Sequence, residues 1–235
     1  MKVIVAFSDE VDRRRAVPEV YGARVPQTSA KPGVTVDVLR ALAARAHQAG
    51  LAVSAHIETA ADFRAAVDAG VDWIAHMPAA WQVGAGTGYG GDELVPWLLT
   101  PEDARNARRR GAVVVTTLAS RAPGDAREPL FRAVHEQNLR LLAAAGVTLP
   151  IGSDRGGGDA VEEAIYLSSL GSLSEAQILN LLASQTPRLI FPELRVGHLQ
   201  PRYEASFLVL GGDPTVDLAN LRDIRMAYKR GERVR

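Results

Sequence analysis

The stretch that decides the fold is residues 51–76, LAVSAHIETAADFRAAVDAGVDWIAH. It contains two short apolar segments that finish at His56 and His76. Between them lies a helix-like segment that begins after Thr59, and Asp62 three residues further on predicts a capping box there. Parallel strands with helical crossovers bring their carboxyl ends to one edge of a sheet, which is where α/β barrels carry out their chemistry. The pattern therefore predicts two imidazoles side by side at that edge.

A third apolar segment, Val147 to Asp154, ends in a carboxylate. Two imidazoles and a carboxylate at matching strand ends predict a divalent metal site, with Zn²⁺ first and Mn²⁺ or Fe²⁺ as alternatives. Each residue also has a simpler interpretation. His56 and His76 can be satisfied core histidines, and Asp154 can cap the turn that follows it.

Composition restricts the function further. The 235 residues include 27 basic and 27 acidic side chains, which argues against nucleic acid or an anionic membrane as partner and leaves a small-molecule substrate. There is no cysteine, so a metal must be held by His, Asp, Glu or a modified Lys. No apolar run is long enough to span a bilayer, and we expect a soluble, cytoplasmic protein.

The order of elements predicts an α/β fold with a parallel sheet. Helices that end at glycine, as at Gly50, Gly70 and Gly111, alternate with strands expected near residues 2–8, 51–57, 71–77, 112–118 and 147–153. Five strands at this spacing are typical of the later part of a (β/α)8 TIM-type barrel, which needs eight. Two antiparallel strands, Ala205–Leu210 and Arg225–Arg235, separated by a Gly-Asp-Pro turn, are expected at the end of the chain.

Two long loops interrupt this pattern. Residues 9–34 lack periodicity, and the Gly-rich segment 78–99 carries Trp81, Tyr89 and Trp97. We interpret the second loop as a flexible lid over the strand ends, whose aromatic side chains contact substrate or pack on the rim.

Several motifs, in order along almost the whole chain, resemble the metal-dependent amidohydrolase superfamily, in particular its imidazolonepropionase and prolidase-like branches. The matching pieces are AHQAG (46–50) before VSAH, AGVDWIAH (69–76), GAVVVTTL (111–118), NLRLLAAAGVTLPIGSD (138–154), SQTP (184–187), GHL (197–199), EASFLVLGGDP (204–214) and KRGERV (229–234).

This resemblance implies a partial barrel over residues 1–190 and a remnant of a small β-sandwich over 191–235. It implies that His56, His76 and Asp154 end the fifth, sixth and eighth barrel strands and bind one or two metal ions. His76 and Asp154 are then catalytic as well, with Asp154 moving the proton of the attacking water. Lys2 falls where some branches carry a carboxylated lysine as a metal ligand, although a lysine next to an initiating methionine is also an ordinary chain start.

The implied activity is metal-assisted hydrolysis of an amide, cyclic amide or peptide-like C–N bond. No His-x-His pair, which supplies two ligands on the family's first strand, occurs in the sequence. We therefore expect a truncated form or an internal methionine at position 1, with weak metal affinity. The alternative is a non-catalytic remnant that needs a partner chain, and an uncovered strand at Lys2 to Phe7 predicts homo-oligomers through exposed sheet edges.

Overall fold

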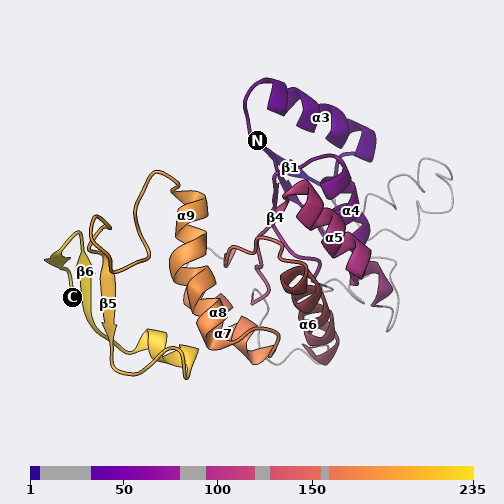
Figure 1. The fold of residues 1–235 in the computed structure, drawn as a ribbon. Coiled ribbons are helices and arrows are strands. Elements are labelled where there is room, and N and C mark those ends of the chain that lie inside the picture. Colours follow the sequence, from indigo (N-terminus) through magenta and orange to yellow (C-terminus); the bar gives the residue numbers. More distant parts are fainter. Residues whose placement is uncertain (6–32, 80–93, 120–127, 155–158) are drawn as a thin grey trace. The chain divides into compact units, whose positions relative to one another are not determined.

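The computed structural model describes residues 1–5, 33–79, 94–119, 128–154 and 159–235 (Figure 1). The chain divides into two compact units. The first comprises Met1–Val115 and Arg121–Thr148, and the second comprises Thr116–Ser120 and Leu149–Arg235.

The first unit is built on a parallel sheet. Its strands are β1 (Lys2–Ile4), β2 (Ser54–His56), β3 (Trp73–Ile74) and β4 (Val113–Val114), which pair in this order and in parallel. A parallel bridge from Val113 to Thr148 continues the sheet into the fifth predicted strand. The predicted α/β class and parallel sheet are confirmed, and closure into a barrel stays a prediction.

The strands are shorter than the apolar runs that predicted them. Pairing beyond the regular ladder is made by single hydrogen bonds, such as those from the Val5 amide to the His56 carbonyl and from the Ala75 amide to the Ala55 carbonyl, both 2.8 Å. At the start of β3 the ladder is irregular, because the amides of Asp72 and Trp73 both donate to the Val53 carbonyl.

The helices of this unit are α3 (Val36–Gln48), α4 (Ala60–Asp68), α5 (Pro101–Arg110) and α6 (Glu128–Ala144). The capping box predicted at Thr59 is present at the start of α4, and Thr100 forms another with Asp103 at the start of α5. Gly111 ends α5 with a φ of 69°, the left-handed conformation that favours glycine.

The two faces of the sheet differ in burial. Val3, Ala55, Ile74 and Val114 are aligned across the four strands, and all four are buried. The adjacent aligned row, Lys2, Ser54, Trp73 and Val113, is exposed or half-buried. Because side chains alternate between faces along a strand, His56 shares the less buried face with Ser54.

The side chain of Asn138 of α6 forms hydrogen bonds with two chain segments that are distant from it in sequence. Its side chain is fully buried, accepts a hydrogen bond from the Leu99 amide, and donates to the carbonyls of Pro78 and Trp97, each at 2.9 Å. The indole of Trp97, in the short helix η1 (Val95–Trp97), is also fully buried and packs with Phe131 and Val134.

Of the two alternatives predicted for Trp97, contact with substrate or packing, the structure shows packing, because Phe131 and Val134 of α6 bury its indole. Trp81 and Tyr89, the other two aromatic residues of that prediction, lie outside the described residues.

Replacing Asn138 by alanine is expected to lower the free energy of unfolding by about 2–3 kcal/mol. The change leaves one amide and two carbonyls without this partner, and most of them lie in the interior, where an unsatisfied polar group costs about 1–3 kcal/mol. Chemical denaturation measures the loss. The neighbouring change Gln137→Ala removes only a 3.5 Å contact to the Leu99 carbonyl and should cost less than half as much. Equal effects of the two changes would contradict the assigned role.

The second unit contains α7 (Ala160–Ser169), α8 (Glu175–Asn180), the π-helical segment η2 (Leu181–Gln185) and α9 (Thr186–Ile190). An antiparallel sheet follows, made of β5 (Phe207–Leu210), β6 (Ile224–Lys229) and β7 (Glu232–Arg233). The antiparallel pairing is confirmed. The single strand predicted over Arg225–Arg235 is wrong in one respect, because Arg230 and Gly231 have positive φ and turn the chain into a hairpin.

The connection between β5 and β6 is longer than the predicted turn, since it includes the 3₁₀-helix η3 (Leu218–Arg222). Within the described part of the chain, no helix combines the length and the apolar character needed to cross a membrane.

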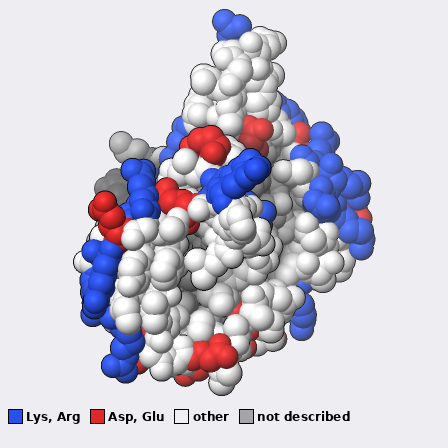
Figure 2. Space-filling model, turned by 60° about the vertical axis from the view of Figure 1, so that its left-hand side comes forward, with Lys and Arg blue, Asp and Glu red and all other residues white. Residues whose placement is uncertain are grey.

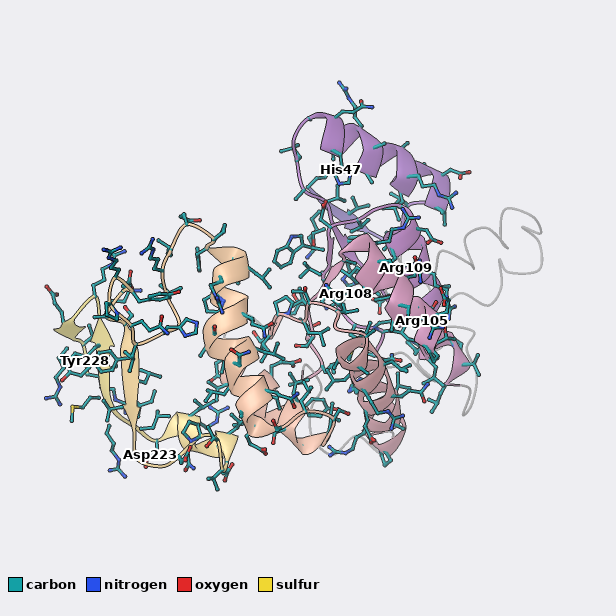
Figure 3. The ribbon with its side chains drawn as sticks, viewed as in Figure 1. His47, Arg105, Arg108, Arg109, Asp223 and Tyr228 are labelled. Atoms are coloured by element: carbon teal, nitrogen blue, oxygen red, sulfur yellow. The ribbon has the colours of Figure 1, made fainter. Side chains whose placement is uncertain are left out.

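Charged side chains of both signs occur on the face drawn in Figure 2. Several basic residues lie on α5, where Figure 3 labels Arg105, Arg108 and Arg109. Glu102, in the first turn of that helix, accepts hydrogen bonds from Arg105 and Arg109 at 2.8 and 2.9 Å. Basic residues in the last turn also suit the negative end of the helix dipole.

Candidate functional site

His56 is the last residue of β2, and the chain immediately beyond it is held in place by the cap of α4. The amides of Glu58 and Thr59 both donate to one oxygen of Asp62, Oδ2, at 3.2 and 2.9 Å. Asp62 is fully buried. The turn after the strand is therefore fixed by hydrogen bonds, which gives His56 and Glu58 a defined backbone from which to project.

The side chain of Glu58 turns back toward His56. Its Oε1 lies 3.0 Å from Nε2 of His56, and the glutamate side chain is 7% exposed while the imidazole is 24% exposed. Residues i and i+2 project to the same side of an extended chain, and Ile57 between them is buried. The result is a histidine whose ring is oriented by a buried carboxyl group.

The structure brings His56 and His76 together. Their ring centroids are 4.5 Å apart with the ring planes at 79°, an edge-to-face arrangement. His76 follows β3 and is half-buried between Ala75 and the buried Met77. The two parallel strands thus deliver two neighbouring imidazoles at their carboxyl ends.

Asp154 belongs to the second unit and is exposed. Its φ of 48° places it in the left-handed region, where an aspartate is tolerated far better than a branched residue. Residues 155–158, with the predicted glycine turn, lie outside the described part of the chain. Lys2 is an exposed residue of β1, aligned with Ser54 and not with His56.

A catalytic zinc usually has three protein ligands and an open position. Within the described ranges, no group of three or more His, Cys, Asp or Glu side chains is arranged to hold a metal ion. The two adjacent imidazoles are suitable nitrogen ligands, so the described residues fit a metal in part. We therefore derive no geometry for such an ion.

The remaining histidines have other contacts. His47 of α3 is labelled in Figure 3. Its Nε2 lies 2.9 Å from a carboxylate oxygen of Asp72. His135 is buried in α6, and its Nε2 donates to the Ala79 carbonyl at 2.7 Å. His198 lies 2.9 Å from the hydroxyl of Ser184. These contacts account for the three histidines outside the predicted site.

Sequence reasoning also missed a buried carboxyl group in the second unit. Glu163 of α7 is fully buried and accepts hydrogen bonds from the amides of Leu118 and Ala119 at 2.7–2.9 Å. Thr117, just before these amides, has a φ of 50°, which is strained for a β-branched residue. Glu163 thus stabilises a strained turn beyond β4.

Burial is the main influence on Glu163 and raises its pKa, against the opposing effect of hydrogen bonds from the amides of Leu118 and Ala119. The folded chain consequently binds this proton more tightly than the unfolded chain does. The resulting stabilisation is complete below the unfolded value of about 4.5 and is lost as the pH rises through the higher folded pKa.

We therefore expect the difference in unfolding free energy between the wild type and Glu163→Gln to fall as the pH is raised from 4, and then to level off. Denaturant titrations between pH 4 and 8 measure it. Glu193→Gln, a change at an exposed position, is the matched control. A difference that is constant or rises with pH would show that burial does not dominate at Glu163.

Comparison with solved structures identifies the fold. The chain is similar to an amidohydrolase, with 25% identity, a TM-score of 0.62, and coverage of 86% of this chain and 48% of the other. It is similar to a prolidase complexed with N-methylphosphonate-L-proline, with 20% identity, a TM-score of 0.65, and coverage of 89% and 52%. It is also similar to a putative prolidase from Bifidobacterium longum, with 21% identity, a TM-score of 0.64, and coverage of 85% and 50%.

No protein-family model matches the sequence, and no curated protein matches it. The structural similarity identifies a fold that this chain shares with an amidohydrolase and with prolidases. The chain spans about half the length of the solved structures it matches.

Proposed function

We propose that this protein is a metal-dependent hydrolase of the amidohydrolase type, acting on an amide, cyclic amide or peptide-like C–N bond of a small molecule. The observation that carries the proposal is the pair of imidazoles at the carboxyl ends of β2 and β3, 4.5 Å apart between ring centroids, with His56 oriented by Glu58. The structural similarity to amidohydrolases and prolidases supports it.

In this proposal His56 and His76 bind the metal, and Asp154 takes part in binding and accepts the proton of the attacking water. When bound, such an ion would lower the pKa of its water to about 7 and would polarise the carbonyl group under attack. The Asp154 carboxyl group, once it has accepted the proton of the water, would return that proton to the leaving nitrogen as a general acid. Lys2 is retained as a further ligand only in a two-metal form in which its amine is carboxylated.

Several structural features favour a catalytic role for this region. His56 lies on the less buried face of the sheet, where a substrate can approach, and not among the buried row of Val3, Ala55 and Ile74. A carboxyl group behind a ligating histidine is the usual way to hold a metal-binding imidazole.

The test is hydrolysis by protein freed of metal with a chelator and reloaded with Zn²⁺, Mn²⁺ or Fe²⁺. Substrates are N-acyl amino acids, Xaa-Pro dipeptides and cyclic amides. We expect activity that is absent after chelation and returns with one of these ions. Activity that is indifferent to chelation would overturn the metal-dependent assignment.

The competing candidate is a non-catalytic protein that retains the fold, favoured by the absence of a three-ligand group among the described residues. It predicts a chain that stays folded, binds none of the three ions and hydrolyses none of the substrates. Size-exclusion chromatography tests the associated prediction of homo-oligomers through sheet edges, since a monomer at all concentrations would contradict it.

A further inference from the structure

A group of exposed apolar side chains lies at the end of α9 and directly after it. Ile190, Phe191 and Leu194 are 54%, 48% and 41% exposed, and Leu199 is 76% exposed. Within the described ranges, no other stretch of ten residues has more than two large apolar side chains that are exposed. Single exposed apolar residues are normal on a protein surface, but several in one short segment indicate a surface that another molecule covers.

The chain around these residues is fixed by hydrogen bonds, although it forms neither helix nor strand between α9 and β5 (Figure 1). The amide of Phe191 donates to the Pro187 carbonyl at 2.8 Å, and the amide of Leu194 donates to the Phe191 carbonyl at 2.9 Å. The Arg195 carbonyl accepts a hydrogen bond from the Glu204 amide at 2.7 Å. A surface that is ordered in the free chain loses little conformational entropy when it binds.

The residues that follow lie against the π-helical segment η2. A Cβ atom on Gly197 would collide with the Ala183 carbonyl oxygen, and Gly197 has a φ of 84° that favours glycine. Nε2 of His198 lies 2.9 Å from the hydroxyl oxygen of Ser184, which is buried. The segment is therefore held to its own unit by these contacts, and its large apolar side chains remain exposed all the same.

Leu194 lies between two charged residues without a partner. Glu193 and Arg195 are both exposed, and neither side chain forms an ion pair or a hydrogen bond with the residues that the structure describes. A surface with one charge of each sign on either side of an apolar residue is complementary to itself. If a two-fold axis passes near Leu194, Glu193 of each copy faces Arg195 of the other. The chain has no net charge, so two copies do not repel each other.

We propose that Ile190, Phe191, Glu193, Leu194 and Arg195 form the interface of a symmetric dimer of this chain. The proposal is independent of any metal and of hydrolysis. An interface of standard size has roughly 20–30 residues on each side, many more than these five, so we expect a weak dimer with a dissociation constant in the micromolar range. At lower concentrations the chain is a monomer in which Glu193 is exposed, and this is the state in which denaturation is measured.

Sedimentation equilibrium of the full chain, over concentrations from about 1 μM to about 1 mM, measures the association. Leu194→Asp places two negative charges next to each other at the two-fold axis, and it should raise the dissociation constant more than tenfold. Val216→Asp is the matched control, because Val216 is 76% exposed in the same unit and outside the interface. It should leave the dissociation constant within about twofold of the wild type.

Two results of this measurement would overturn the proposal. A wild type that stays monomeric at all concentrations would leave another protein as the molecule that covers the apolar side chains. A dimer that Leu194→Asp does not weaken would place the interface elsewhere, for example at the edge of β1.

Charge reversal tests the two-fold arrangement itself. Glu193→Arg and Arg195→Glu each place like charges opposite one another twice in a symmetric dimer, and each should weaken self-association about tenfold. A mixture of the two variants should associate as tightly as the wild type, because the arginines of one chain then face the glutamates of the other. Both positions are exposed, so we expect both variants to fold, which circular dichroism checks. A mixture that associates no better than the separate variants would overturn the proposed interface.

Discussion

Replacing both His56 and His76 by alanine is expected to abolish divalent metal binding. The double variant removes two neighbouring imidazoles, whose ring centroids are 4.5 Å apart. Asp154 and Lys2 are not adequate ligands without them, since structural and catalytic zinc sites need three or four protein ligands. Isothermal titration with Zn²⁺ measures the effect.

The appropriate controls change histidines whose contacts lie elsewhere. His47→Gln alters a half-exposed pair with Asp72, and it should leave zinc affinity within about twofold of the wild type. Circular dichroism should show that the double variant stays folded, because both rings lie outside the fully buried core. Unchanged zinc affinity in the double variant would remove the basis of the metal site.

The second large effect is expected at Asp154. Asp154→Asn should lower kcat by about 10²–10⁴-fold, the usual contribution of a positioned general acid or base. Asparagine is the informative substitution because, like aspartate, it tolerates the left-handed conformation that residue 154 adopts, with a φ of 48°. The variant therefore removes the proton acceptor without forcing the backbone to change.

Asp159 provides the matched control in the same unit. Its carboxylate caps α7 by accepting a hydrogen bond from the Glu162 amide at 2.7 Å, and it is also paired with Arg222. Asp159→Asn should cost at most about 1 kcal/mol of stability and leave kcat unchanged. A kcat for Asp154→Asn equal to that of the wild type would remove Asp154 from the chemistry.

Local patterns in the sequence predicted much of the first unit. Apolar segments, and glycines at the ends of helices, predicted the parallel strands and their helices. The spacing of Thr59 and Asp62 predicted a capping box that the structure contains. Two apolar segments ending in histidine also pointed to imidazoles at one edge. These features depend on residues that are close together in the sequence. They can therefore be predicted without knowledge of the tertiary structure.

Contacts between distant segments were not predictable in this way. Glu163 stabilises a turn 44–45 residues earlier in the chain, and nothing distinguishes it beforehand among 27 acidic residues. Trp97 looked like a residue of a loop because its neighbours are irregular, and only the packing of α6 shows that it is buried. Glu58 could have been suspected from its position two residues after a strand-terminal histidine, but its burial depends on the tertiary fold.

The most direct test of the account is anomalous diffraction at the zinc edge from a crystal of the wild type grown or soaked with Zn²⁺. The account predicts a zinc peak that both the imidazole of His56 and the imidazole of His76 contact as ligands. It also predicts that the contact between His56 and Glu58 remains. Zinc bound only at the exposed pair of His47 and Asp72, with both site imidazoles free of metal, would contradict it.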